Sequence, residues 1–470
     1  MTRPARRPAP APEPFLLEVF LTSRCNMDCS YCAARYMIHA REHRSLTLAQ
    51  LKRAAELIAA DPAVRRRHGG RAKISFTGGE PMLEFSLIKE AVAWMKRRHP
   101  DWEFDVSTNG TLLTPENLDF FVDNGVGLSV SLDGYRGVND SHRKFAGGGR
   151  SAFGVVEGYL RRGLASPRYR GLFHVAATLT SATIGNLPEV VRYFREEAGL
   201  GELEIALEAY EPWDAPAREK LRRVLRGLGR RAATDLAGGA AADGAFSEFL
   251  FTQAKTSDCR DLESKALTLF YDGAFYPCDF VVKPPLDARF RAGDLERGLD
   301  LGRLRGIAAL PLFGEIERGC EYQSGLLSPL ERYYWGLVHG YSRARLARLL
   351  RDTSETNRVF HEELGPYLRL QRAYSRLFMT PGFGDLAHGP KYRGRGEVAA
   401  LALAGGGPGL PAMRAAADYA LYSPGAAKRL ALRAGAPSGE AEGLAVYALA
   451  KARALGKRLR VSLEDGGGAA

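Results

Sequence analysis

Three cysteines near the N-terminus have the spacing of a metal-binding loop. Cys25, Cys29 and Cys32 form a CxxxCxxC pattern directly after a short apolar run, and no further Cys or His follows before His39. Three close thiolates can hold one side of a 4Fe-4S cubane and leave the fourth iron without a protein ligand. The alternatives are a structural zinc site, which usually has four ligands in paired spacings, or three unrelated thiols. The spacing favours an iron-sulfur cluster with one open coordination position.

Polar motifs also follow the next apolar runs of the chain. They are Gly78-Gly79-Glu80-Pro81, Ser107-Thr108-Asn109-Gly110 and Ser131-Leu132-Asp133-Gly134. Glycines allow the backbone to approach a ligand closely. Taken singly, an Asn-Gly pair is compatible with a simple turn, Arg143 with a surface charge and Tyr31 with core packing. The Gly-Gly-Glu-Pro motif, some fifty residues after the cysteines, is the most specific of them.

With Tyr31 directly before the third cysteine and the Gly-Gly-Glu-Pro motif behind it, the chain resembles the radical S-adenosylmethionine (SAM) superfamily. The resemblance implies that the cluster binds SAM through its open iron and cleaves it reductively to a 5'-deoxyadenosyl radical. Asn109 and Ser131 would lie near the ribose or methionine of SAM, and Arg143 would pair with its carboxylate. The implied cofactor-binding residues are Tyr31, Gly78, Gly79, Glu80, Pro81, Asn109, Ser131 and Arg143.

A second group of cysteines, Cys259, Cys278 and Cys320, lies more than two hundred residues after the first. Together with Gly273 in a GxxxxC arrangement, it resembles the SPASM extension of that superfamily or its shorter twitch form. The full SPASM pattern has seven cysteines, and Gln323 stands where a fourth would be expected. We therefore expect one auxiliary 4Fe-4S cluster ligated by Cys259, Cys278 and Cys320. The alternative is a segment that has lost its cluster and keeps three buried thiols.

Asp279 is a candidate catalytic residue by the same resemblance. It lies next to Cys278 and matches an acidic position that is proposed to deprotonate the substrate in anaerobic sulfatase maturases. The alternative is an aspartate that caps a turn of a hairpin.

The fold class expected is α/β, because short apolar runs alternate with amphipathic stretches up to about Tyr210. We expect a partial (β/α)6 TIM-like barrel, with the motifs at the carboxyl ends of its strands. The expected strands are Leu16–Leu21, Lys73–Phe76, Glu103–Ser107, Gly127–Leu132, Phe173–Thr180 and Leu203–Ala209. The expected domains are a disordered tail (1–14), the barrel (15–235), a linker (236–256), the twitch-like domain (257–325) and a helix-rich C-terminal region with a disordered end (326–470).

The composition indicates a globular protein in a reducing compartment. The sequence has 470 residues, 45% hydrophobic and 26% charged, and no apolar stretch of the roughly 18 residues needed to cross a bilayer. The arginine-rich start lacks the apolar core of an export signal, so we expect a cytoplasmic protein that is not bound to a membrane. The net charge of +12 suits an acidic peptide, but the arginines are scattered without interleaved aromatics, and we do not expect nucleic acid as a partner.

Three functions are open at this point. The motif set favours modification of a precursor peptide or a protein, with an external electron donor of the flavodoxin or ferredoxin type. A twitch-like extension also occurs in dehydrogenases that oxidise small aminocyclitol or sugar alcohols, so this class is the alternative. A non-catalytic scaffold would require damaged cluster ligands or a damaged Gly-Gly-Glu-Pro motif, and both are intact.

Overall fold

The computed structural model describes residues 12–169, 171–200, 203–238, 266–277, 290–300, 302–303, 311–319, 326–378, 401–404, 429–435 and 460–465. The chain divides into two compact units, one formed by Met1–Asp214 with Thr256–Asn357 and the other by Ala215–Lys255 with Arg358–Ala470. Of the described helices, none combines the length and the apolarity that a membrane crossing requires.

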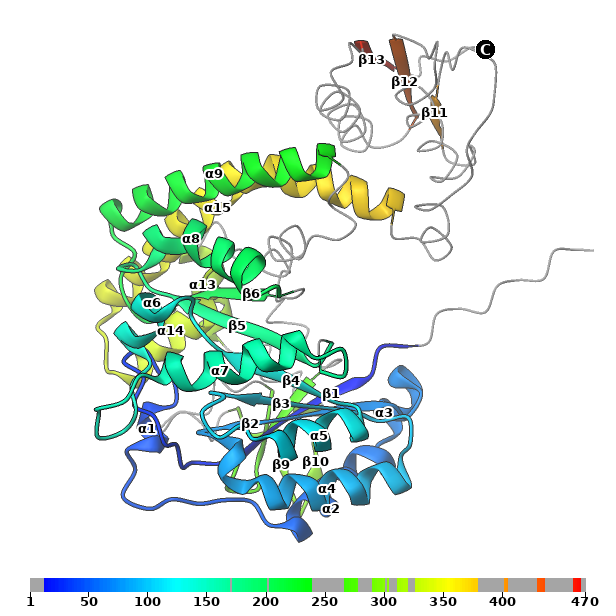
Figure 1. The fold of residues 1–470 in the computed structure, drawn as a ribbon, viewed down its shortest axis with the longest axis vertical. Coiled ribbons are helices and arrows are strands. Elements are labelled where there is room, and N and C mark those ends of the chain that lie inside the picture. The colour runs from blue at the N-terminus through cyan, green and yellow to red at the C-terminus, as the bar shows by residue number, and fades with distance from the viewer. Residues whose placement is uncertain are drawn as a thin grey trace, which may run out of the picture. The chain divides into compact units, whose positions relative to one another are not determined.

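The first unit is built on an eight-stranded sheet in the order β6-β5-β4-β3-β2-β1-β7-β8. Strands β1 to β6 are labelled in Figure 1. All neighbouring strands are parallel except β7 and β8, which are antiparallel. The strands are β1 (Phe15–Thr22), β2 (Ala72–Gly78), β3 (Glu103–Thr108), β4 (Val126–Ser131), β5 (Phe173–Leu179), β6 (Leu203–Leu207), β7 (Ala266–Leu269) and β8 (Phe275–Tyr276). The first six match the expected strands to within two residues at each end, and the partial TIM-like barrel is confirmed. A further small antiparallel pair is formed by β9 (Gly293–Asp294) and β10 (Gly298–Leu299).

Side chains alternate along each barrel strand between an apolar and a more polar face. In β3, for example, Phe104 and Val106 are buried in the apolar core, whereas Asp105 and Ser107 are only half-buried. Successive residues of a strand point to opposite faces, so one face packs under the helices and the other faces the interior of the barrel. The small inward residues nearest the carboxyl ends of β2 to β6 are Thr77, Ser107, Ser131, Thr178 and Ala206. They leave space at that end of the barrel.

The helices that follow the strands begin at clear capping signals. Thr47 and Gln50 form a capping box at the start of α2, and Thr114 with Asn117 does the same for α5, which ends at Gly125 in the left-handed conformation. The helical elements of the barrel are α1 (Arg35–Ile38), α2 (Leu48–Ala60), α3 (Pro62–His68), η1 (Pro81–Glu84), α4 (Phe85–Arg98), α5 (Pro115–Asn124), α6 (Arg136–His142), α7 (Ala152–Ala165), η2 (Ile184–Asn186), α8 (Leu187–Arg192) and η3 (Tyr193–Glu197). They connect consecutive parallel strands, as a crossover connection requires.

The C-terminal part of the chain contributes to both units. Helices α13 (Pro311–Gly319) and α14 (Pro329–Val338) belong to the first unit, and α15 (Arg343–Phe378) passes from the first unit into the second. Within the second unit, α9 (Ala215–Gly238) lies beside the C-terminal half of α15, where Arg222 and Arg226 bind Glu363 (Figure 1). The same unit contains a parallel sheet of β11 (Leu401–Ala404), β12 (Arg429–Gly435) and β13 (Arg460–Asp465), which the expectation of a helix-rich region did not include.

Candidate active site

A cavity of about 350 Å³ lies at the carboxyl ends of the parallel strands. The three thiols of Cys25, Cys29 and Cys32 line it, and so do the predicted cofactor-binding residues Tyr31, Gly78, Gly79, Glu80, Asn109, Ser131 and Arg143. Pro81 does not line this cavity, because it is buried as the first residue of η1. The first three cysteines and all predicted cofactor-binding residues except Pro81 therefore line one cavity.

The cysteine loop is held in place by pairing with the last residue of α6 and the segment that follows it. Asp28 donates its backbone N–H to the Lys144 carbonyl over 2.8 Å, and Ser30 donates to the His142 carbonyl over 3.1 Å. Met27 forms an antiparallel bridge with Phe145. Because this pairing uses backbone groups, it fixes the path of the loop whatever its side chains bind.

The two glycines of the Gly-Gly-Glu-Pro motif are required by the protein's own backbone. Gly78 has a φ of +138°, and a Cβ added to it would lie 2.7 Å from the Thr22 carbonyl oxygen. At Gly79 the added Cβ would lie 2.2 Å from the Arg24 carbonyl oxygen. Backbone hydrogen bonds join the same segments, since Gly79 donates to Thr22 over 2.9 Å and Glu80 donates to Arg24 over 2.8 Å. We expected the glycines to allow approach to a ligand; here they allow the motif to pack against the start of the cysteine loop.

Glu80 connects this motif to the end of β3 by hydrogen bonds. Its carboxylate is fully buried and accepts hydrogen bonds from the backbone of Met82 (3.0 Å), the hydroxyl of Thr108 (2.6 Å) and the backbone of Asn109 (2.8 Å). Burial raises the pKa of Glu80, and the three donors oppose that rise. Glu80 therefore organises the wall of the cavity through bonds to neighbouring loops.

Asn109 joins the third strand end to the cysteine loop. Its side-chain N–H donates to the Asn26 side-chain oxygen over 2.8 Å, and its own oxygen accepts from the backbone and the hydroxyl of Thr111. Asn26 in turn donates to the Thr111 hydroxyl over 2.8 Å. These bonds occupy much of the hydrogen-bonding capacity of the Asn109 amide, which is why it holds a fixed orientation at the cavity.

A buried ion pair lies beside the cysteine loop. The Arg143 Nε is 3.0 Å from Asp133 Oδ1, and the exposed fractions of the two side chains are 10% and 1%. Asp133 also accepts the Thr178 backbone N–H over 2.9 Å and the hydroxyl proton of Tyr31, whose ring lies under the Arg143 guanidinium. Burial lowers the pKa of Arg143, but Asp133, Tyr31 and Cys29 raise it by more. Asp133 thus ties the aromatic residue of the cysteine loop to the ends of β4 and β5.

Three thiols that line one cavity are a ligand set suited to a 4Fe-4S cluster. The thiols are free, and burial raises the pKa of Cys25 to about 12, that of Cys29 to about 11 and that of Cys32 as well. Buried thiols lose their protons when strong positive charge, such as that of iron, is bound. Cys25, Cys29 and Cys32 would therefore hold a 4Fe-4S cluster across this cavity.

The opposite wall of the cavity consists of residues that the sequence did not single out. Glu208 and Tyr210 follow β6, Thr178 lies at the end of β5, and Glu331 comes from α14. The position of Glu208 was detectable in principle, because the other candidates were found directly after strands. It was missed because the sixth strand was expected to continue to Ala209, whereas it ends at Leu207.

The second cysteine group lies outside the described residues, as does Asp279. The segment before Cys278 is described as far as Pro277, and within it β7 pairs with β8 in an antiparallel hairpin. Gly273 has a φ of +84° in the turn between them. The auxiliary cluster and the role of Asp279 therefore stay predictions.

Comparison with known proteins finds a family model that matches the cysteine-bearing part of the barrel. The family described as "Radical SAM superfamily" matches residues 19–158, which contain the cysteine loop, the Gly-Gly-Glu-Pro motif and Arg143. Residues 19–158 therefore match a radical SAM domain, and members of that superfamily bind a 4Fe-4S cluster and SAM.

Individual relatives match only part of the chain. The cysteine-type anaerobic sulfatase-maturating enzyme of Clostridium perfringens (strain 13 / Type A) is 26% identical over 180 residues, which are 37% of this chain and 47% of that enzyme. The GTP 3',8-cyclase of Rhizobium meliloti is 33% identical over 134 residues, 27% of this chain and 36% of that enzyme. This chain therefore spans half or less of the length of these two enzymes.

Among solved structures, "Native anSMEcpe with bound AdoMet and Kp18Cys peptide" is similar to the chain at a TM-score of 0.56. The sequence identity is 19%, and the match covers 76% of this chain and 98% of that protein. At this identity the likeness establishes a shared fold.

The contact between Gly79 and Arg24 can be tested by adding one methyl group. We expect Gly79→Ala to lower the free energy of unfolding by about 2 kcal/mol, because the backbone at Arg24 must move. We also expect it to reduce the iron bound per chain, because the same movement displaces the cysteine loop. Urea unfolding and iron analysis measure the two effects. Gly185→Ala is the control, since its Cβ would meet nothing within 4 Å. Iron binding equal to that of the wild type would contradict the role of this contact.

The contribution of the Asp133–Arg143 ion pair to stability can also be tested. Asp133→Asn should lower the free energy of unfolding by about 3 kcal/mol, because it leaves the Arg143 charge buried without its counter-charge. Adding Arg143→Met to this variant should recover part of that loss, which a double-mutant cycle in urea measures. Glu116→Gln, which removes an exposed partner of Lys89, should change stability by less than about 0.5 kcal/mol. An effect of Asp133→Asn as small as that of the control would refute the coupling.

Proposed function

We propose that the chain is a radical SAM enzyme that modifies a peptide or a protein. The observation that carries this proposal is the single cavity, which extends from the three thiols at the cysteine loop to Glu208 and Tyr210 beyond β6. Such a space suits a cofactor at the thiol end with its substrate alongside. The bound cluster and SAM would supply a 5'-deoxyadenosyl radical that takes a hydrogen atom from the substrate.

The residues of the chain would bind and orient the two ligands. Backbone groups of Gly79 and Glu80 would receive the SAM ammonium, while Asn109 and Ser131 would contact its ribose or methionine. Arg143 lines the cavity with its charge balanced by Asp133, and it would offer its remaining N–H groups to the SAM carboxylate. The buried positions of Glu80 and Asp133 would keep this frame rigid and exclude water.

The relatives support a peptide or protein substrate. The partial match to a sulfatase-maturating enzyme and the shared fold with a peptide-bound protein both favour it. An external electron donor of the flavodoxin or ferredoxin type, an auxiliary cluster held by Cys259, Cys278 and Cys320, and proton removal by Asp279 are further parts of the proposal. These parts rest on the sequence alone.

The test is anaerobic turnover with dithionite, SAM and a panel of synthetic peptides that carry deuterium at side-chain carbons. The wild type should form 5'-deoxyadenosine, transfer deuterium into it from at least one peptide, and change the mass of that peptide. Cys29→Ala should form none, because one ligand of the cluster is lost, and Glu116→Gln should match the wild type. Deuterium transfer from a labelled aminocyclitol and from no peptide would overturn the peptide assignment. Absence of 5'-deoxyadenosine from the wild type would overturn the enzyme assignment altogether.

A further inference from the structure

The turn after β6 forms part of the cavity wall and is closed by its own side chains. The Glu208 carboxylate accepts the backbone N–H of Tyr210 over 2.6 Å and that of Glu211 over 2.7 Å. The fully buried Trp213 donates its indole N–H to the Glu208 carbonyl over 3.0 Å. Because Glu208 and Tyr210 both line the cavity, the shape of this turn sets the shape of the wall.

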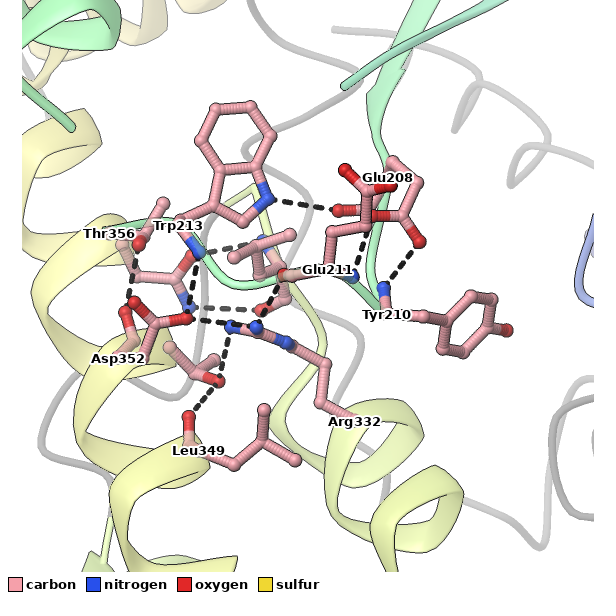
Figure 2. Close-up of polar contacts among 11 residues, drawn as sticks. Glu208, Tyr210, Glu211, Trp213, Arg332, Leu349, Asp352 and Thr356 are labelled. Carbon is pink, nitrogen blue, oxygen red and sulfur yellow. Dashed lines mark hydrogen bonds and ion pairs between the residues drawn. The ribbon is translucent and has the colours of Figure 1, made fainter. Parts of the chain in front are cut away.

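A buried arginine from α14 joins this turn to two helices (Figure 2). Arg332 has no exposed side-chain surface, and it donates to the Glu211 carbonyl over 2.9 Å and to the Thr353 hydroxyl over 3.0 Å. It also forms an ion pair of 2.8 Å with Asp352, whose carboxylate accepts the Trp213 backbone N–H over 3.2 Å. The guanidinium therefore reaches the turn directly through Glu211 and indirectly through Asp352.

A contribution to folding stability does not by itself explain why an arginine is buried at position 332. The Arg332 Nε is buried without a hydrogen-bond partner among the described residues, and burying a guanidinium is costly. Apolar residues in place of a buried ion pair often leave a protein equally stable or more stable. What an apolar side chain cannot provide is a directional bond to the Glu211 carbonyl and one to Asp352. The arrangement therefore favours a role in geometry.

We propose that Arg332 is a positioning residue that fixes the Glu208–Trp213 turn as the substrate-facing wall of the cavity. It follows that α14 is part of the substrate chamber. Glu331, the neighbour of Arg332 on α14, lines the same cavity. The sequence left open whether the region after residue 326 binds a partner or forms a lid, and this inference assigns its first helix to the active site. The inference rests on the proposed function, which places the substrate in this cavity.

The test is hydrogen exchange of the anaerobically reconstituted full-length protein, measured by mass spectrometry. In Arg332→Met, the amides of Tyr210 and Glu211 should exchange about tenfold faster, because the turn has lost its bonds to α14. Exchange in residues 22–32 and 103–111 should stay unchanged. Arg226→Met removes an arginine that binds Glu363 in the second unit and serves as the matched control. In this control, the amides of Tyr210 and Glu211 should exchange at the wild-type rate.

Two milder variants separate the loss of the Arg332 bonds from a general folding defect. Thr353→Val keeps the volume of the side chain and removes the acceptor for Arg332, so it should accelerate exchange in the same turn by a smaller factor. Arg332→Lys keeps the charge beside Asp352 and should restore part of the protection. Unchanged exchange at 208–213 in a folded Arg332→Met protein would overturn the proposal. So would faster exchange spread evenly over the barrel.

Turnover distinguishes a positioning role from a purely structural one. With a peptide that the wild type modifies, Arg332→Met should raise KM about tenfold. Its formation of 5'-deoxyadenosine without peptide should stay within twofold of the wild type. A faster-exchanging turn with an unchanged KM would contradict the positioning role. If the wild type modifies no peptide, the proposed function fails, whereas the exchange result still decides whether Arg332 holds the turn.

Discussion

The close contact between two backbone segments is the constraint on which the site depends. Gly78 and Gly79 lie so near Thr22 and Arg24 that no side chain fits between them. This contact sets the end of β2 against the beginning of the cysteine loop, and pairing with residues 142–146 holds the other side of that loop. The three thiols are therefore presented by a loop that is fixed from two directions. Such preorganisation limits the rearrangement that binding a cluster would require.

Buried charges connect this loop to the rest of the barrel. Glu80 and Asp133 are both almost fully buried, and each accepts hydrogen bonds from more than one element of the fold. A buried carboxylate is tolerated only with such partners, so each one imposes a specific arrangement on the loops around it. The turn after β6 is held in a similar way, because the buried Glu208 accepts the backbone N–H of Glu211 and the buried Arg332 donates to the Glu211 carbonyl.

The sequence predicted the elements whose signals are local. The six barrel strands were found because apolar alternation and flanking turn residues are visible over short windows, and the thiols and the Gly-Gly-Glu-Pro motif were found from their spacing. Asp133 was part of a noted motif, but its ion pair with Arg143 was not foreseen, because a pairing across the fold has no local pattern. Arg332 gave no signal at all, since its partner Glu211 lies far away along the chain. Strands β11 to β13 were missed within stretches that read as helical or glycine-rich.

We infer that Cys25, Cys29 and Cys32 together hold a cluster with one iron open to SAM. Electron paramagnetic resonance of the dithionite-reduced, anaerobically reconstituted protein tests it most directly, with and without SAM. To isolate this cluster, the spectra should be recorded on a variant with Cys259, Cys278 and Cys320 replaced by alanine. We expect a reduced 4Fe-4S signal whose g-values shift when SAM is added. A signal whose g-values do not change when SAM is added would rule out an open iron that binds SAM. The absence of a signal from folded protein would rule out the cluster itself.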